Sequence, residues 1–248
     1  MRLSRPRAVR AVGLAAVAVV GAAVALLAIR PWAASRGTVP APPGEPIPLP
    51  APRLEGAISV EEALAARRSL RSFGSEPLSL QEVGQLLWAA QGVTDARGYR
   101  TAPSAGALYP LEVYLVCRRV EELEPGVYRY LPSDHALSAV AAASRGGDAC
   151  EALARAALGQ SPVRDAAANV VFAGVYERTT AKYGYRGHQY VHIEVGHAAE
   201  NVYLQATALG LATVAVGAFD DAEVAQVLLL PEGETPLYVM PVGRPATE

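Results

Sequence analysis

The stretch "TAPSAGALYPLEVYLV" (Thr101–Val116) joins a turn directly to a strand. Its first half, from Pro103 to Gly106, consists of turn-forming and small residues, and its second half alternates apolar side chains as a core strand does. Two interpretations of the turn remain open. The loop is either tight for purely structural reasons, or its small residues let a flat molecule lie against the backbone, as glycine does at cofactor sites.

Two helix starts precede this stretch, each marked by a capping box. Ser59 is followed by Glu62 and Ser79 by Glu82, the spacing at which serine and glutamate side chains satisfy each other's backbone N–H groups. After the second box, apolar residues recur with helical spacing up to Gly92, which predicts the end of that helix.

The rest of the soluble part mixes strands and helices without a regular strand–helix–strand alternation. We expect strands over 112–120, 126–131, 169–177, 212–219 and 235–243, and helices over 146–160, 188–211 and 220–230. This order predicts an α+β fold with a mostly antiparallel sheet.

The N-terminus has the pattern of a membrane segment. An uncharged run from Ala11 to Ile29 is about as long as the ~20 residues that cross a bilayer. Four arginines precede the run, which predicts a cytoplasmic N-terminus and a folded domain on the extracytoplasmic side. The length favours an uncleaved anchor over a cleaved signal. We therefore expect an anchor or signal over 1–35, a proline-rich linker over 36–53 and a folded domain over 54–248.

Composition excludes some classes of function. The net charge of -2 gives no basic field for nucleic acid. No dinucleotide fingerprint, P-loop or nucleophile elbow is present. His188 and His192 are four residues apart with Glu194 nearby, but His197 would face elsewhere, so no metal site is expected. Cys117 and Cys150 lack metal-type spacing, and a disulfide between them stays open.

A cluster of arginines suggests an anion site. In "ARRSLRSF", helical spacing would bring Arg67, Arg68 and Arg71 to one side, next to the Ser69 hydroxyl. Forked guanidinium donors suit a phosphate dianion, although a solvated helix end explains the same residues. Arg244, in "PVGRP" at the end of the last strand, is a further candidate for the phosphate.

Five segments in order resemble the nitroreductase superfamily, and more narrowly its SagB-type branch, the azoline dehydrogenases of thiazole/oxazole peptide biosynthesis. The segments are "RRSLRSF", "APSAGALYPLEVYLV", "KYGYRGHQYVHIEVGHAAENVYLQATALGL", "VGAFDD" and "PVGRP". Each is weak by itself, but together they cover the chain from about Leu54 to Pro245.

This resemblance implies a nitroreductase-like α+β sandwich, with helices on both sides of the sheet, that binds FMN as a homodimer with two flavins at the interface. It assigns the phosphate and ribityl contacts to Arg67, Arg68, Ser69 and Arg71, with Arg244 as a C-terminal phosphate contact. It assigns the segment along the flavin ring to Gly217 and Ala218. It assigns the turn that reaches the ring from the partner subunit to Pro103, Ser104, Ala105 and Gly106.

The resemblance also implies a catalytic pair, Lys182 and Tyr183, in "AKYG". Ordinary nitroreductases commonly carry Asn and Gln where this chain has Ala107 and Tyr109, and "GALYP" is similar to the SagB-type version. Aromatising an azoline requires a base to remove a carbon-bound proton while hydride goes to flavin N5, and an amine or phenol suits that task. The alternative is a polar loop in which Lys182 is simply solvated.

The expected function is therefore FMN-dependent hydride transfer between a substrate, such as a peptide azoline, and the flavin. Two alternatives remain: a nitro or quinone reductase with a nicotinamide donor, and a non-catalytic flavin-binding module tethered to the membrane. Expected partners are a second copy of the chain, a small-molecule or peptide substrate and, through the N-terminal helix, the membrane.

Overall fold

The computed structural model describes residues 45–140 and 148–246. Its sheet has seven strands in the order β1-β4-β3-β2-β5-β7-β6, and every neighbouring pair is antiparallel. The strands are β1 (Ile47–Pro48), β2 (Leu111–Cys117), β3 (Gly126–Leu131), β4 (Ala136–Ala139), β5 (Ala168–Val175), β6 (Ala212–Thr213) and β7 (Glu234–Gly243). The helices are α1 (Val60–Ala66), α2 (Leu80–Gln91), the 3-10 turn η1 (Ala105–Ala107), α3 (Ala149–Ala156), α4 (Ser161–Asp165), α5 (Tyr176–Tyr183), α6 (Arg186–Ala208) and α7 (Asp221–Leu228).

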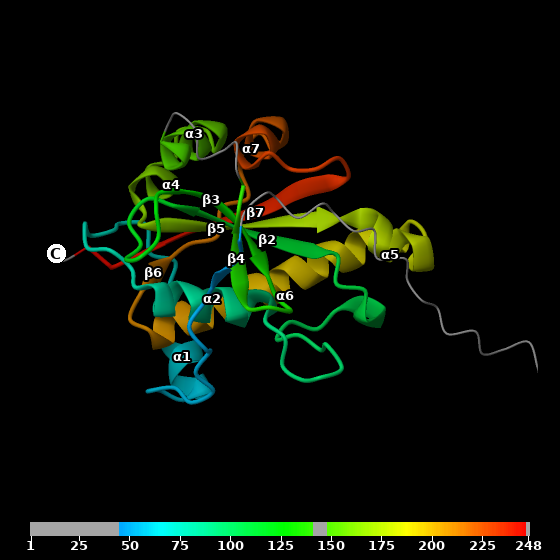
Figure 1. Ribbon diagram of the computed structural model, residues 1–248, viewed down its shortest axis with the longest axis horizontal. Helices are drawn as coiled ribbons and strands as arrows, with labels where there is room; N and C mark the ends of the chain where they lie inside the picture. Colours follow the sequence, from blue (N-terminus) through cyan, green and yellow to red (C-terminus); the bar gives the residue numbers. More distant parts are fainter. Residues whose placement is uncertain (1–44, 141–147, 247–248) are drawn as a thin grey trace, which may run out of the picture. The chain divides into compact units, whose positions relative to one another are not determined.

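Helices cover both faces of the sheet, as Figure 1 shows: α3, α4 and α7 lie on one side, and α1, α2 and α6 on the other. Alternation along the central strands produces the two cores. In β5, Val170 and Phe172 pack toward α2 and α6, whereas Val171 and Ala173 pack toward α3, α4 and α7. The predicted α+β fold with a mostly antiparallel sheet is confirmed.

The capping boxes also form as predicted. The Ser59 and Ser79 side chains accept the backbone N–H of Glu62 and Glu82, whose carboxylates bind back to the cap N–H groups. Gly92 caps α2. The long central helix expected over 188–211 is α6, whose buried side chains make it the main cover of one face.

Packing begins before the boundary expected at Leu54. Within the stretch assigned to the linker, Ile47 and Pro48 pair with β4 at the edge of the sheet, and Leu49 is buried. An edge strand accommodates proline because its outward side needs no ladder hydrogen bond. The backbone N–H of Arg53 then donates to Gln85 Oε1 of α2 at 2.8 Å.

The membrane prediction falls on Ala11–Ile29, which lies outside the described residues. Over 45–140 and 148–246, no helix combines the length and the apolar character that a bilayer crossing requires. Cys117 and Cys150 are both free and buried, and they belong to the cores on opposite faces of the sheet.

Candidate functional site

The turn before β2 has an unusual backbone. Gly106 has a φ of 64°, and the non-glycine residues Ala107 and Tyr109 have φ values of 53° and 47°. The left-handed region costs an L-residue about 1–2 kcal/mol, so the turn needs contacts that hold it in this shape.

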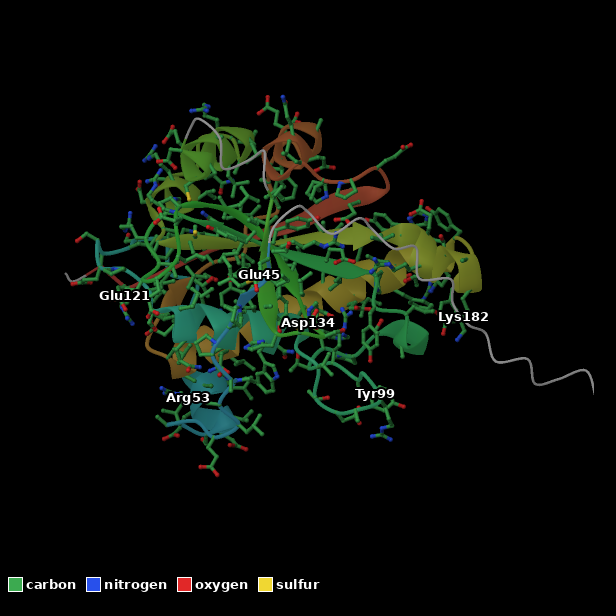
Figure 2. All side chains as sticks on the ribbon, viewed as in Figure 1. Glu45, Arg53, Tyr99, Glu121, Asp134 and Lys182 are labelled. Atoms are coloured by element: carbon green, nitrogen blue, oxygen red, sulfur yellow. The ribbon has the colours of Figure 1, made fainter. Side chains whose placement is uncertain are left out.

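The C-terminal end of α5 lies directly over this turn. A Cβ added to Gly106 would lie 2.7 Å from Tyr183 Oη and 2.8 Å from Lys182 Nζ. Only glycine leaves room for both groups there. Figure 2 labels Lys182 beside α5, at the margin of the fold, and its side chain is exposed. The structure thus brings two groups of predicted site residues together: the Pro103–Gly106 turn and the Lys182–Tyr183 pair.

The alternative interpretation, in which the segment around Lys182 and Tyr183 is a polar loop, is wrong. Lys182 and Tyr183 form the last turn of a helix, and α6 begins three residues later at Arg186. The Tyr183 ring meets the Tyr190 ring of α6 edge-on, with 5.1 Å between their centroids. The pair is therefore presented by two packed helices.

Three contacts clamp the turn at Tyr109. Its N–H donates to Ser104 Oγ at 2.9 Å, and its carbonyl accepts from Arg178 Nη1 at 2.9 Å. The Arg100 guanidinium lies over its ring, 4.6 Å from the centroid. Because both backbone groups of Tyr109 are bonded, its left-handed conformation is fixed from two sides.

A buried carboxyl supports the same turn. Glu194 of α6 is 2% exposed, and its Oε1 has no hydrogen-bond partner among the described residues. Burial raises the pKa of Glu194 to about 7, against the opposing effects of a hydrogen bond from Ser104 and the charge of Arg100. Sequence reasoning gave Glu194 no role in this turn. The available signal was a glutamate on the buried stripe of an amphipathic helix.

The arginine segment is not helical, which corrects the expectation that its side chains share a helix face. Helix α1 ends at Ala66, and Arg67 is its C-cap with extended geometry. The segment instead runs along α6: Ser69 Oγ lies 3.0 Å from Tyr203 Oη, and Arg67 lies over the Tyr203 ring. Tyr203 Oη also accepts the N–H of Ala215, which ties this segment to the strand end before Gly217.

The predicted phosphate arginines differ in how they are engaged. Arg68 and Arg71 are exposed, and neither forms an ion pair with a carboxylate over 45–140 and 148–246. Arg244 instead holds both oxygens of Glu82, at 2.7 and 3.0 Å. Two of its five N–H donors are used in this way, so the others stay available to an anion.

A pocket of about 430 Å³ adjoins Gly217. Aromatic side chains of Tyr176, Phe219 and Tyr238 contribute to its lining, and Tyr176 Oη lies 2.5 Å from His192 Nε2. His192, Asp221 and Thr235 add polar groups to the lining, and the aromatic rings beside them suit a flat heterocycle. The chemistry of these residues fits a flavin mononucleotide: aromatic rings suit the flavin ring, and Arg68 and Arg71, which pair with no carboxylate over 45–140 and 148–246, suit a phosphate dianion.

The two halves of the predicted site are separated along α6. Ser69 contacts Tyr203, and Tyr183 contacts Tyr190. Tyr190 and Tyr203 are thirteen positions apart, which at a rise of 1.5 Å per residue is about 20 Å along the helix. The catalytic pair of one chain therefore lies far from the phosphate-binding segment of the same chain.

The histidines serve other contacts. His188 and His192 both pack against the Tyr176 ring. His135 lies between Tyr130 Oη and the Pro50 carbonyl. Within the described ranges, no three His, Cys, Asp or Glu side chains are grouped as metal ligands.

The structure combines an antiparallel sheet between helical layers with a cationic segment and a small-residue turn beneath a helix. The nitroreductase family matches residues 64–244, and the chain belongs to this family. Its members are generally oxidoreductases and typically bind a flavin. A Methanocaldococcus jannaschii protein described as a nitroreductase is 48% identical over 201 residues, which are 81% of this chain and 98% of that protein.

Two further similarities concern peptide processing. The microcin B17-processing protein McbC of Escherichia coli is 32% identical over 161 residues, 62% of this chain and 57% of McbC. A solved structure of the E. coli microcin synthetase McbBCD complex with truncated pro-MccB17 bound contains a chain with TM-score 0.63 and 28% identity. That match covers 83% of this chain and 79% of the other. This chain thus spans little more than half of McbC in the sequence match.

Glu194 should make stability depend on pH. Its folded pKa of about 7 lies above the ordinary value of 4.5, so its neutral form stabilises the fold fully below pH 4.5. That contribution is lost as pH rises to about 7 and amounts to about 3 kcal/mol at 1.36 kcal/mol per pKa unit. The free energy of unfolding of Glu194→Gln minus that of wild type should therefore be larger at pH 8 than at pH 4.5, because only the wild type is destabilised as pH rises. Urea denaturation at both pH values measures this, and an equal difference at both would contradict it.

Gly106→Ala should displace the Lys182–Tyr183 pair without unfolding the chain. Gly98→Ala is the matched control, because Gly98 also has a left-handed φ, of 83°, but nothing within 4 Å of an added Cβ. Both variants should lose about 1–2 kcal/mol of stability. Only Gly106→Ala should change the rate of Lys182 acetylation, followed by peptide mass spectrometry, because only there does the added methyl group displace the amine. Equal acetylation in the two variants would show that the pair does not lie over Gly106.

Proposed function

We propose that the chain is an FMN-dependent dehydrogenase of the SagB type, in which Lys182 and Tyr183 handle the proton while a substrate ring loses hydride. The observation that carries the proposal is the placement of the Lys182 amine and the Tyr183 hydroxyl together over Gly106. They meet at the small-residue turn that the resemblance assigns to the flavin ring.

The choice of lysine at this position supports a chemical role. The chain has 22 Lys and Arg residues, and Lys182 is the only lysine among them. A guanidinium stays protonated in proteins, whereas an ammonium can give up its proton and then act as a base. A side chain that only carries a solvated positive charge does not need this property, and arginine fills the 21 other Lys or Arg positions of the chain.

The proposed cofactor contacts follow from the two halves of the site. Arg67, Arg68, Ser69 and Arg71, with the free donors of Arg244, would hold the phosphate and ribityl chain. Gly217 and Ala218 would lie along one side of the ring, and Pro103, Ser104, Ala105 and Gly106 would approach it from the partner. When bound, FMN supplies a two-electron acceptor at N5.

The proposed substrate is a peptide azoline. One ring carbon gives its proton to Lys182 or Tyr183, the neighbouring carbon gives up hydride, and a C=C bond forms between them. The two electrons then leave to a second acceptor of the quinone or dioxygen class. The similarity to McbC and to a chain of the peptide-bound McbBCD complex supports a peptide substrate.

The separation along α6 supports a homodimer with shared sites. One flavin contacting both halves would take its phosphate contacts from one subunit and the Lys182–Tyr183 pair from the other. Each dimer then has two such sites. We further propose that residues 1–35 anchor this domain, through the proline-rich stretch that precedes Ile47, on the extracytoplasmic side of a membrane.

The alternative within the family is reduction of nitro compounds or quinones with a nicotinamide donor. The 48% identity to the M. jannaschii protein described as a nitroreductase favours it. The two functions differ in the electron donor: NAD(P)H should reduce the bound flavin in the alternative, and an azoline peptide should do so in our proposal.

Lys182→Arg and Tyr183→Phe should abolish turnover while leaving flavin binding intact. Arginine keeps the positive charge but cannot act as a base, and phenylalanine keeps the ring but lacks the hydroxyl. We expect the rate of flavin reduction by a thiazoline-containing peptide to fall about 10²–10⁴-fold, the range of general acid–base catalysis. Stopped-flow absorbance measures this rate. Wild-type rates in both variants would remove the pair from the mechanism.

Mixed dimers should test the shared site. Arg68→Glu/Arg71→Glu should lose FMN, and Lys182→Arg should keep FMN but be inactive. Co-expression of the two chains should restore about a quarter of wild-type activity, because half of the dimers are mixed and each mixed dimer holds one intact site of two. Each variant alone is the control. No recovery in dimers shown to be mixed would place all site residues in one subunit.

A further inference from the structure

One side chain joins the catalytic helix to the turn beneath it. Arg178 of α5 donates from Nη1 to the Tyr109 carbonyl at 2.9 Å and from Nη2 to Glu112 Oε1 at 2.6 Å. Tyr109 belongs to the left-handed turn, and Glu112 to strand β2. One guanidinium therefore links three elements: α5, the turn and the sheet.

The acceptor on the sheet is itself held in place. Glu112 is 11% exposed, and its second oxygen accepts from Arg129 of β3, 2.7 Å from Nη2. Arg129 also approaches Glu234 of β7, which accepts from Tyr114 Oη at 2.8 Å. Two arginines and two glutamates balance in charge within this network. Arg178 is thus anchored to side chains from three strands of the sheet.

Arg178 and the proposed catalytic lysine lie on the same helix, so fixing Arg178 also fixes the position of Lys182. Lys182 follows Arg178 by four residues, so the two side chains leave the same face of α5. The Tyr109 carbonyl that Arg178 holds is three residues from Gly106, over which Lys182 Nζ and Tyr183 Oη lie. The bond to Tyr109 therefore fixes both the helix and the turn at their point of contact.

We propose that Arg178 is a positioning residue that sets the Lys182–Tyr183 pair over the Gly106 turn. It acts through Tyr109 and α5 and touches neither cofactor nor substrate. The catalytic part of this inference rests on the proposed function. Arginine suits the position because its fork reaches a carbonyl and a carboxylate at once, whereas a lysine amine at the same place would favour one of them.

A matched control exists at the other end of β2, on the same face of the sheet as Glu112. Arg118 likewise donates to one carbonyl, that of Arg164 at 2.8 Å, and to one carboxylate, that of Asp148. Its side chain is 24% exposed, close to the 31% of Arg178. The change Arg118→Gln therefore removes the same kinds of bond as Arg178→Gln, far from the turn.

The experiment compares Arg178→Gln, Arg178→Lys and Arg118→Gln in the full chain. Three quantities are measured: the melting temperature, the rate of Lys182 acetylation and the single-turnover rate of flavin reduction by a thiazoline-containing peptide. Because Lys182 is the only lysine, peptide mass spectrometry separates its acetylation from that of the N-terminal amine. The acetylation rate can be measured whether or not the protein binds flavin.

We expect similar losses of melting temperature in the two glutamine variants. Only Arg178→Gln should change the rate of Lys182 acetylation, and only this variant should slow flavin reduction, by about 10²-fold for a displacement near 1 Å, with FMN content unchanged. Arg178→Lys adds a second lysine, so only its flavin reduction is scored, and this variant should recover part of that rate. Identical acetylation in Arg178→Gln and Arg118→Gln would overturn the proposal. If wild type binds no FMN or is not reduced by the peptide, the proposed function fails, and acetylation still decides whether Arg178 positions the pair.

Discussion

The packing of α6 on the sheet is the constraint that the proposed site depends on. Its buried stripe runs through Val191, Val195, Ala198, Val202 and Ala206, at the three- and four-residue spacing of one helix face. Because this face is fixed against the core, α6 cannot bend or slide to bring its ends together. Tyr190 and Tyr203 therefore stay about 20 Å apart along the helix. Each tyrosine holds one half of the proposed site, and a single chain does not close the two halves on one another.

The charged side chains divide into two functions. Arg129, Arg178, Glu112 and Glu234 lie between strands and helices, where permanent charges in pairs avoid the cost of an isolated buried charge. Lys182 differs from them in chemistry and in place, since it is the only lysine of the chain and it is exposed above the turn. Arg129 and Arg178 thus hold structural elements together, and Lys182 lies over the turn where we propose the chemistry takes place.

Local signals in the sequence predicted much of the fold. Signals that depend on neighbours within a few residues were all recognised in the sequence. They are the capping boxes at Ser59 and Ser79, the alternation of side chains in β2 and the long apolar stripe of α6. The extended course of Arg67–Arg71 was missed because it depends on a distant contact with Tyr203. Edge pairing of Ile47–Pro48 was missed for the same reason.

In the candidate site, too, sequence patterns identified some residues, whereas others depend on contacts between distant parts of the chain. The resemblance pointed to the Pro103–Gly106 turn and to Lys182–Tyr183, and the structure places them in contact. Arg178 and Glu194 support the contact between the turn and the Lys182–Tyr183 pair, but no sequence motif marks either residue. Their partners, Tyr109 and Ser104, are 69 and 90 residues away in the chain, and only the folded structure brings them together.

The most direct test is the absorption spectrum of the purified full chain, with the released cofactor identified by mass. Our account predicts a yellow protein with about one FMN per chain, because each dimer would hold two shared sites. A colourless protein that does not take up FMN on reconstitution would contradict the account: the turn, the arginine segment and the pair over Gly106 would then have no common ligand.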